Sequence, residues 1–396
     1  MSERQDHLDA SVSEDSALSA ASKVVSNTLE RSRSWSDDKF ARIVLLLPGF
    51  LIVLLLSIFP LIISLYLSVA QVNFVKGGVQ VVYVGLDNYA ELLTGPNRSH
   101  LLGSWGDIPW YGALIFAVFV ALLLYMLYGY LRRPGRGFFG LLLRLFAIVF
   151  ASALAFLIVA TLTGGDTNIP GTLVVTLVFV GFGVSIEYAL GLGLALLVTQ
   201  ELPGKRFFRV AFLLPMMITP VGVGFIFRMM ADTSKGPIAP LWNAAGLVDI
   251  TWAGTGFGAR AAVLIGDIWQ WTPFMFIILL AALEAMSRDQ VEAALVDGAT
   301  RRQLFRYLLV PQILPVSITL VLIRTIEAFK IIDLPNILTG GGPGAATESL
   351  TFNAYNLWRT TELGSSAAVS YILLIVVTFV AIVYMNSIRR RLMERL

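Results

Sequence analysis

Long apolar segments separated by short polar loops dominate the chain. Pro48 and Pro60 in the first segment, and Pro215 and Pro220 in the fifth, allow a tilted or broken helix there. The pattern predicts an all-α integral membrane protein with about eight transmembrane helices. Each apolar segment has about the 20 residues that a helix needs to cross the hydrocarbon of a bilayer, and the segments are roughly 43–71, 111–131, 140–162, 171–199, 208–231, 261–284, 312–332 and 368–388.

The distribution of Lys and Arg predicts the orientation, because these residues accumulate on the cytoplasmic side of a membrane. With the N-terminus inside, the inner segments hold 21 of the 29 Lys and Arg residues and the outer loops hold four. We therefore expect both termini in the cytoplasm. The same orientation places the loop 285–311 inside and the loops 72–110, 232–260 and 333–367 outside.

Composition narrows the possible chemistry. The chain is 57% hydrophobic and 14% charged, whereas a soluble protein has about 25% charged residues. It contains no cysteine, and its two histidines, His7 and His100, lie outside the apolar segments. These facts exclude thiolate and zinc-thiolate sites and leave no intramembrane imidazole for catalysis.

The internal loop 285–311 has the pattern of two short helices. Gln290 to Asp297 contains good helix formers, and Gly298 suits the left-handed position past a helix end. A second helix is expected from about Ala299 to Leu309, before Pro311 opens the next span. Two interpretations fit these residues equally: a knob that docks in a partner's groove, and an amphipathic linker between two spans.

A resemblance favours the docking interpretation. Glu292-Ala293-Ala294, then three residues, Gly298, nine residues and Leu308-x-Val310-Pro311, closely resemble the EAA loop of the membrane subunits of binding-protein-dependent ABC importers, EAA-x3-G-x9-I-x-L-P. Three further segments resemble the carbohydrate branch of that family, which includes the maltose, glycerol-phosphate and trehalose permeases. They are Val84-Gly-Leu-Asp-Asn-Tyr89, Leu190-Gly-Leu-Gly-Leu-Ala-Leu-Leu197 and Leu338-Thr-Gly-Gly-Gly-Pro343.

The resemblance implies an ABC importer type I permease fold in a bacterial inner membrane. It implies a heterodimer with a second permease, two ATPase subunits, an extracytoplasmic solute-binding protein and a carbohydrate or polyol substrate, with no nucleic acid. The chain lacks a P-loop GxxxxGK[ST], so ATP and Mg are expected on the partner ATPase, and no cofactor, metal or catalytic residue is expected here. The residues that would couple to the ATPase are Glu292, Ala293, Ala294, Leu295, Asp297, Gly298, Phe305 and Pro311.

The resemblance also suggests how the chain is organised. Residues 1–40 contain ten serines and no apolar run, which is typical of a disordered cytoplasmic tail. Residues 41–97 form the first span and an external loop. Residues 98–166 are an inserted pair of spans that a typical six-span member lacks, and residues 167–396 form the core permease domain with the coupling loop 285–311.

Charged residues inside apolar segments mark a polar pathway or an ion pair between helices, because they are costly in a membrane. Glu187, Asp267, Arg324, Glu327 and Lys330 are such residues. Glu187 and Arg324 each lie 12 residues from the cytoplasmic end of their spans, or about 18 Å deep at 1.5 Å per residue. We therefore predict a Glu187–Arg324 ion pair, with a purely structural role as the alternative to a substrate contact.

Substrate-lining candidates come from the resemblance to the maltose permease. Arg324 suits an anionic sugar derivative, whereas Glu327 beside it argues against one. Trp271 could stack on a sugar or belong to an interfacial aromatic belt. The departures at Pro220, Trp271, Ala328 and Ile331 favour a smaller or differently shaped ligand, or a pathway formed mainly by the partner. The candidates are Met216, Pro220, Asp267, Trp271, Phe274, Arg324, Glu327, Ala328 and Ile331.

Three other functions are considered. An ion-coupled secondary transporter predicts inverted repeats with half-helix ion sites. A membrane enzyme predicts catalytic histidines or paired carboxylates near the headgroups. A purely structural subunit predicts a transport path that lies in its partner.

Overall fold

The computed structural model describes residues 44–104, 108–132, 138–163, 169–200, 203–246 and 254–393. The predicted tail, residues 1–40, lies outside these ranges. The chain divides into two units, residues 1–66 and 67–396. The described part of the first unit is helical and includes the π-helical segment η1 (Leu54–Ile58) and most of α2 (Phe59–Ser68), with its apolar side chains exposed as a lipid-facing span requires.

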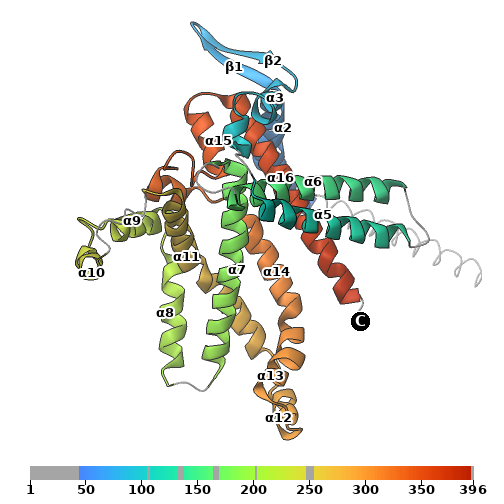
Figure 1. Cartoon of the computed structure of the whole chain (residues 1–396), viewed down its shortest axis with the longest axis vertical. Helices are drawn as coiled ribbons and strands as arrows, with labels where there is room; N and C mark the ends of the chain where they lie inside the picture. The colour runs from blue at the N-terminus through green and yellow to red at the C-terminus, as the bar shows by residue number, and fades with distance from the viewer. Residues whose placement is uncertain are drawn as a thin grey trace, which may run out of the picture. The chain divides into compact units, whose positions relative to one another are not determined.

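The second unit is predominantly helical (Figure 1). Helices α7 and α11 form its centre, and α14 packs against both of them. Its helices are α3 (Asp87–Leu93), α4 (Arg98–Leu102), α5 (Trp110–Leu131), α6 (Phe138–Thr163), α7 (Thr172–Thr199), α8 (Lys205–Met217), α9 (Pro220–Ala231), α10 (Ala239–Ala244), α11 (Gly256–Glu284), α12 (Arg288–Val296), α13 (Arg301–Gln303), η3 (Leu304–Leu309), α14 (Val310–Ala328), η4 (Pro335–Thr339), α15 (Leu350–Arg359) and α16 (Leu363–Met393).

Two short antiparallel sheets accompany the helices. Strand β1 (Ala70–Val75) pairs with β2 (Gly78–Tyr83) in a hairpin, and β3 (Gly103–Ser104) pairs with β4 (Ile169–Pro170). The hairpin was not predicted from the apolar segments. Gly77 has a φ of +112°, a conformation that favours glycine.

Six helices within the described residues are long and apolar enough to cross a membrane, or seven if the bent pair α8–α9 counts as one span. The remaining predicted segment, 140–162, lies in α6, whose most apolar stretch Ala147–Ala160 is shorter. The six are Val44–Ser68, Trp110–Gly129, Thr172–Thr199, Gly256–Glu284, Arg301–Ala328 and Leu363–Asn386.

The predicted fifth span is broken. Helices α8 and α9 meet at an angle of 95°. Thr219 precedes Pro220 and takes an extended conformation, with φ −63° and ψ 145°, because a residue before proline is disfavoured in the helical region. The Thr219 hydroxyl then accepts a hydrogen bond from the Gly222 amide and begins α9. The sequence Thr219-Pro220 therefore ends one helix and starts another.

Close packing of α7 on α11 forms the core. A Cβ at Gly191 would lie 2.5 Å from the Met275 Cβ, so the glycine permits the two helix backbones to approach closely. Phe276 and Leu279 of α11 are fully buried in the same cluster. The Thr176 hydroxyl of α7 accepts a hydrogen bond from the Leu350 amide at 2.8 Å, which attaches the start of α15 to this core.

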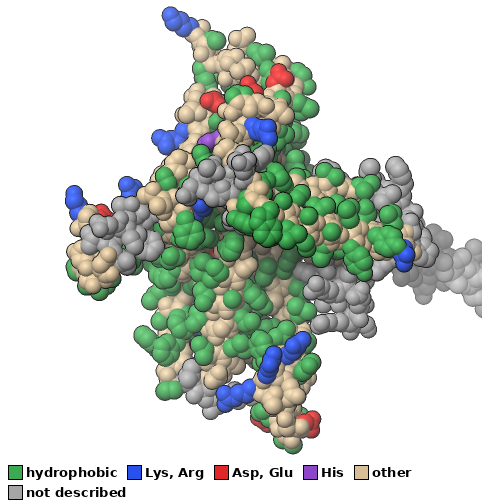
Figure 2. All heavy atoms as spheres, in the orientation of Figure 1, with side chains coloured by type: hydrophobic (Ala, Val, Ile, Leu, Met, Phe, Trp, Pro, Cys, Tyr) green, Lys and Arg blue, Asp and Glu red, His purple; other side chains and the backbone are tan. Residues whose placement is uncertain are grey.

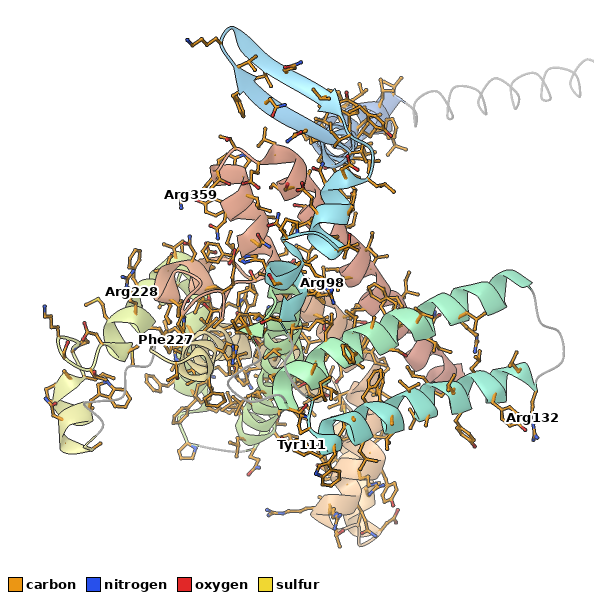
Figure 3. The ribbon with its side chains drawn as sticks, turned by 45° about the horizontal axis from the view of Figure 1, so that its top comes forward. Arg98, Tyr111, Arg132, Phe227, Arg228 and Arg359 are labelled. Atoms are coloured by element: carbon orange, nitrogen blue, oxygen red, sulfur yellow. The ribbon has the colours of Figure 1, made fainter. Side chains whose placement is uncertain are left out.

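The residues of the predicted insertion form a helical hairpin. Helices α5 and α6 pack against each other, and α6 contacts α7. Figure 3 shows Tyr111 near the start of α5 and Arg132 just beyond its end. The Tyr111 hydroxyl donates to the Thr163 carbonyl at 3.2 Å, and the Arg132 guanidinium lies 4.5 Å from the Tyr128 ring. These contacts hold the two helices together at one end and place a cation at the other.

An ion pair joins α4 to the segment before α15. His100 Nε2 lies 3.1 Å from Glu348 Oε2. Asn356 Nδ2 donates to the other oxygen of Glu348 at 2.9 Å and fixes the carboxylate. The hydrogen bond to Glu348 raises the pKa of His100 above its usual 6.5, and burial opposes this rise.

Side chains are segregated on the surface. Figure 2 shows hydrophobic side chains over the lengths of α7, α8 and α14, and Lys and Arg near α12 and α13 as well as on other projecting parts of the chain. The apolar surface of these helices agrees with a body that lies in a membrane.

Candidate functional site

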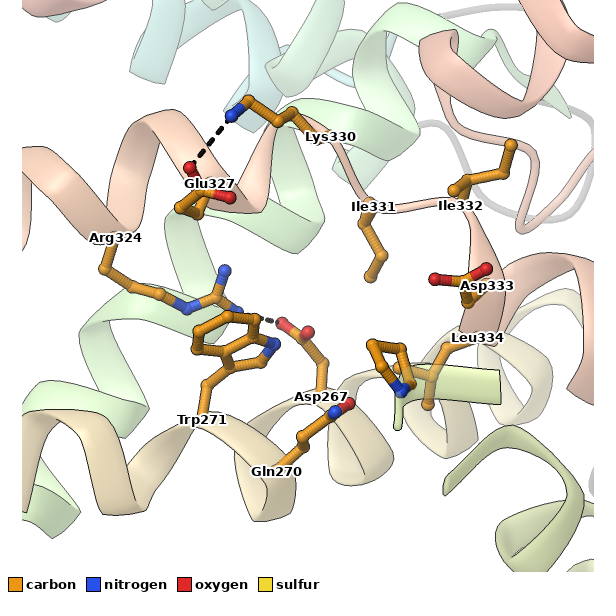
Figure 4. Close-up of a pocket in the computed structure, with 11 residues that line it drawn as sticks. Asp267, Gln270, Trp271, Arg324, Glu327, Lys330, Ile331, Ile332, Asp333 and Leu334 are labelled. Atoms are coloured by element: carbon orange, nitrogen blue, oxygen red, sulfur yellow. Dashed lines mark hydrogen bonds and ion pairs between the residues drawn. The ribbon is translucent and has the colours of Figure 1, made fainter. Parts of the chain in front are cut away.

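A pocket of about 170 Å3 lies where α9, α11 and the end of α14 approach one another. Figure 4 shows Asp267, Gln270 and Trp271 on α11 facing Arg324 and Glu327 on α14. The residues after α14 close the other side. The pocket is lined by Pro220, Asp267, Gln270, Trp271, Arg324, Glu327, Lys330, Ile331, Ile332, Asp333 and Leu334.

Arg324 forms the base of this pocket. Its Nε and Nη2 donate to the two carboxylate oxygens of Glu187 on α7, each at 2.8 Å. Nη2 also donates to Asp267 Oδ2 on α11 at 2.6 Å. The three side chains, which we call the charge cluster, join three helices. The structure thus brings together Glu187 and Arg324, the residues for which we predicted an ion pair, and adds Asp267 to them.

Burial makes the charge cluster important for stability. Arg324 is 1% exposed and Glu187 is 0% exposed. Removing one partner from a buried ion pair costs about 3–5 kcal/mol, because the remaining charge is left uncompensated. Next to the cluster, the Tyr188 hydroxyl donates to Ser317 at 2.9 Å and provides a second polar link between α7 and α14.

The Trp271 ring packs against the guanidinium group of Arg324. The Arg324 Cζ lies 4.6 Å from the centre of the Trp271 ring, a distance at which a cation is attracted to the π face. Phe274 packs edge-on against Trp271 with ring centres 6.1 Å apart. The tryptophan predicted as either a sugar platform or a belt residue therefore contacts the charge cluster and lines the pocket.

The other substrate-lining candidates differ in position. Pro220, Glu327 and Ile331 line the pocket, whereas Met216, Phe274 and Ala328 are not among its lining residues. Met216 is exposed on α8, Phe274 is half-buried and Ala328 is buried against the core. Ala328 directly follows the lining residue Glu327 and so points to a different side of the helix, whereas Phe274 contacts the lining residue Trp271 from outside the pocket.

Sequence reasoning missed several lining residues. Gln270 lies between the candidates Asp267 and Trp271. It is three residues, about one helical turn, after Asp267 and therefore lies on the same face of the helix. Lys330 belongs to the recognised run of charges and forms a 2.8 Å ion pair with Glu327. Asp333 follows the end of the span, and no motif pointed to it.

The predicted coupling loop forms a compact knob, which we define as residues 288–309. Helix α12 ends at Val296, and Gly298 has a φ of +80°. The Ala299 amide donates to the Ala294 carbonyl at 3.0 Å and the Gly298 amide to Leu295 at 3.1 Å. These two bonds form a Schellman motif, which satisfies the last carbonyls of α12. The glycine therefore takes the helix-ending position that the sequence predicted.

The second helix of the knob begins with a capping box. The Thr300 hydroxyl accepts from the Gln303 amide, and the Gln303 side chain accepts from the Thr300 amide. The expected end near Leu309 is wrong, because the chain passes from α13 through η3 into α14 as one helical run, Arg301–Ala328. Pro311 lies inside this run, just after the π-helical segment η3. A single rod therefore connects the knob to Arg324.

Residues of the knob differ in exposure. Glu292, Ala293, Asp297 and Gly298 are exposed, and Ala294 and Phe305 are partly buried. Leu295 is 52% exposed and Val296 is 87% exposed. Gln312 Nε2 donates to Gln290 Oε1 at 2.8 Å and holds α12 against the base of α14.

No group of three His, Cys, Asp or Glu side chains within the described ranges is arranged to hold a metal ion. The two carboxylates of the charge cluster accept hydrogen bonds from Arg324. The site accordingly offers ion pairs, an amide and an aromatic surface, which are groups that bind a solute by hydrogen bonds and stacking.

Residues 113–394 match the family of binding-protein-dependent transport system inner membrane components. The chain belongs to this family. It is therefore a membrane permease subunit of an inner-membrane transport system and not an enzyme, and ATP hydrolysis belongs to a separate subunit.

Curated relatives include three named sugar or glycerol-phosphate permeases. The trehalose/maltose transport system permease protein of Thermococcus litoralis is 35% identical over 217 residues, which cover 55% of this chain and 74% of the relative. The trehalose transport system permease protein of Mycobacterium tuberculosis is 32% identical, with 54% and 68% covered. The sn-glycerol-3-phosphate transport system permease protein of Agrobacterium fabrum is 29% identical, with 54% and 73% covered.

A solved structure shares the fold. It is a chain of a bacterial ABC transporter involved in the import of the acidic polysaccharide alginate. The TM-score is 0.51 at 20% sequence identity, and the match covers 71% of this chain and 93% of that chain. The predicted ABC permease fold is confirmed by this match together with the family assignment.

Proposed function

We propose that this permease imports a carbohydrate or polyol, which an extracytoplasmic solute-binding protein delivers, and that ATPase subunits drive it through the knob. The named substrates of the relatives support the solute class. The family description supports the dependence on a binding protein. The transporting unit would be a heterodimer with a second, homologous permease and two ATPase copies.

The observation that carries the coupling role is the apolar surface of the knob. Leu295, Val296 and Tyr307 are 52%, 87% and 72% exposed. The orientation predicted from the Lys and Arg distribution would put these side chains in the cytoplasm, where no lipid would cover them. Apolar side chains that cluster on a compact protrusion are typical of a protein–protein contact. An ATPase groove that receives the knob would bury them.

The helical rod supplies the route from the knob to the pocket. Arg301–Ala328 is a continuous helix of 28 residues, about 42 Å long at 1.5 Å per residue. Arg324, near its far end, is attached to α7 and α11 by the charge cluster. A displacement of the knob by the ATPase would therefore move three helices together.

The coupling role predicts the effect of Gly298→Asp. An L-residue in the left-handed region costs about 1–2 kcal/mol, which would disrupt the Schellman motif and displace α12. The variant should insert normally but lose solute uptake, substrate-stimulated ATP hydrolysis and co-purification with the ATPase subunit. Membrane insertion, uptake into proteoliposomes and ATPase activity are the measurements.

Gly246→Asp is the matched control for this substitution. Gly246 has a φ of +69°, and, as at Gly298, no atom of the residues that the structure describes lies within 4 Å of an added Cβ. It stands after α10 in a predicted external loop, so the same strain and charge should leave ATPase coupling intact. Wild-type coupling in Gly298→Asp would refute the role of the knob.

A further inference from the structure

The hydrogen-bonding groups of the pocket indicate the charge of the solute, given the proposed import function. The relatives include permeases named for neutral sugars and for the anionic sn-glycerol-3-phosphate. Their names therefore leave the charge of this chain's solute open. The lining side chains can decide it, because a pocket takes a ligand whose donors and charges complement its own.

Both cations that line the pocket already have carboxylate partners. Arg324 is bound to Glu187 and Asp267, so two carboxylates share its charge. Lys330 is paired with Glu327 at 2.8 Å. Neither cation leaves an unmatched positive charge for an anionic ligand. An anion would have to displace one of these carboxylates, and in the case of Arg324 this would leave a carboxylate buried without its partner.

Two acceptors in the pocket are free. Gln270 is 3% exposed, and its Nε2 donates to the Ile218 carbonyl at 3.2 Å. Gln270 Oε1 is buried and accepts no hydrogen bond from any of the described residues. An unsatisfied buried acceptor is costly. A ligand hydroxyl that reaches Gln270 from the pocket would satisfy it.

Asp333 is the second free acceptor. Its carboxylate forms no hydrogen bond or ion pair with another residue in the part of the chain that the structure describes. Figure 4 shows Asp333 on the opposite side of the pocket from Arg324. A negative charge at this position attracts hydroxyl donors and repels an anionic group.

We propose that this pocket selects an uncharged, polyhydroxylated solute, whose hydroxyl groups donate to Gln270 Oε1 and the Asp333 carboxylate, and that it rejects anionic sugar derivatives. Trp271 supplies an apolar surface for the C–H face of the sugar ring. The pocket thus recognises hydroxyl donors and uses Asp333 to exclude negative charge.

The test compares glucose and glucuronate, two monosaccharides that share a ring and differ in a carboxylate. Binding to the full-length chain in lipid nanodiscs is measured by calorimetry and by Trp fluorescence. Glucose should bind at least about tenfold more tightly, since a like charge near Asp333 is repelled. Equal or tighter binding of glucuronate would overturn the proposal, and so would the absence of binding by both sugars.

Asp333→Asn removes the charge and keeps the shape of the side chain. It should reduce the preference for glucose by about tenfold, mainly through tighter binding of glucuronate. Asp87→Asn makes the same change on an exposed residue of α3 outside the pocket, and should leave the preference unchanged. An unchanged preference in Asp333→Asn would refute the role of Asp333.

Uptake by the complete importer separates this proposal from the proposed function. An importer that carries glucuronate as readily as glucose would retain the transport function and refute the selection of uncharged solutes. An importer that moves no carbohydrate or polyol would refute the proposed function itself.

Discussion

The charge cluster and the knob lie at two ends of one helix. They differ in whether their side chains have partners within the chain. In the charge cluster, buried ionic side chains pair with one another, since Arg324 binds both Glu187 and Asp267. The knob exposes apolar groups such as Leu295 and Val296 and leaves them unmatched. A region whose side chains are paired within the chain stabilises the fold. A region with exposed apolar side chains needs a partner protein to bury them.

The largest expected effect comes from breaking the charge cluster. Arg324→Met should destabilise the protein by about 3–5 kcal/mol, because two carboxylates would remain buried without a cation. Thermal unfolding of the purified protein, followed by Trp fluorescence, measures the loss. Arg228→Met is the control: Arg228 is exposed and donates to the Ile337 carbonyl, so its loss should cost less than about 1 kcal/mol.

A neutral cluster separates charge from packing. Combining Arg324→Met with Glu187→Gln and Asp267→Asn removes all three charges and should recover much of the lost stability, since a neutral replacement of similar volume leaves no uncompensated ion. If the triple variant were as unstable as Arg324→Met, the packing of the Arg324 side chain and not its charge would account for the loss.

A smaller effect is expected at the His100–Glu348 pair, in which the His100 side chain is 44% exposed and the Glu348 side chain 9% exposed. Since the pKa of His100 is raised above 6.5 in the folded state, its stabilisation is complete below pH 6.5 and is lost as the pH rises through the higher, folded value. Such a pair contributes at most about 1 kcal/mol. Unfolding temperatures between pH 6 and 9 should show this dependence, and His100→Gln should flatten it.

The smallest effect on stability is expected at the knob. Leu295→Asp should change the free energy of unfolding by less than about 0.5 kcal/mol, because the side chain is exposed in the isolated chain. It should nevertheless abolish stimulation of the ATPase. Leu241→Asp on α10, where Leu241 is 67% exposed, is the control that should preserve stimulation. A large loss of stability in Leu295→Asp would mean that Leu295 stabilises the chain itself and is not reserved for a partner.

The features that could be predicted from the sequence depend on a local pattern or on the position of a residue along its helix. Equal depth in two spans was enough to predict that Glu187 and Arg324 meet, and the structure places their charged groups 2.8 Å apart. The helix end at Gly298 followed from the helix formers before it and the absence of a Cβ. In each case the information is local, or needs only the length of a helix.

Other features depended on how helices are rotated about their axes. Asp267 joins the charge cluster because α11 presents that face to Arg324, and the near-continuous apolar pattern of α11 does not reveal which face this is. Alignment suggested Met216 and Phe274 as lining residues, but neither lines the pocket, although Phe274 packs against the lining residue Trp271. The β1–β2 hairpin had a local signal, Gly77-Gly78 between alternating residues, which the search for apolar segments overlooked.

The break between α8 and α9 ties the shape of the backbone to the solute pocket. At the break, Ile218 has an extended backbone conformation, and its carbonyl accepts a hydrogen bond from the Gln270 side chain. The Gln270 amide group therefore serves the bent backbone with one atom and faces the pocket with another. A change in the angle between α8 and α9 would move the Ile218 carbonyl, and the Gln270 amide that is bonded to it would have to turn as well.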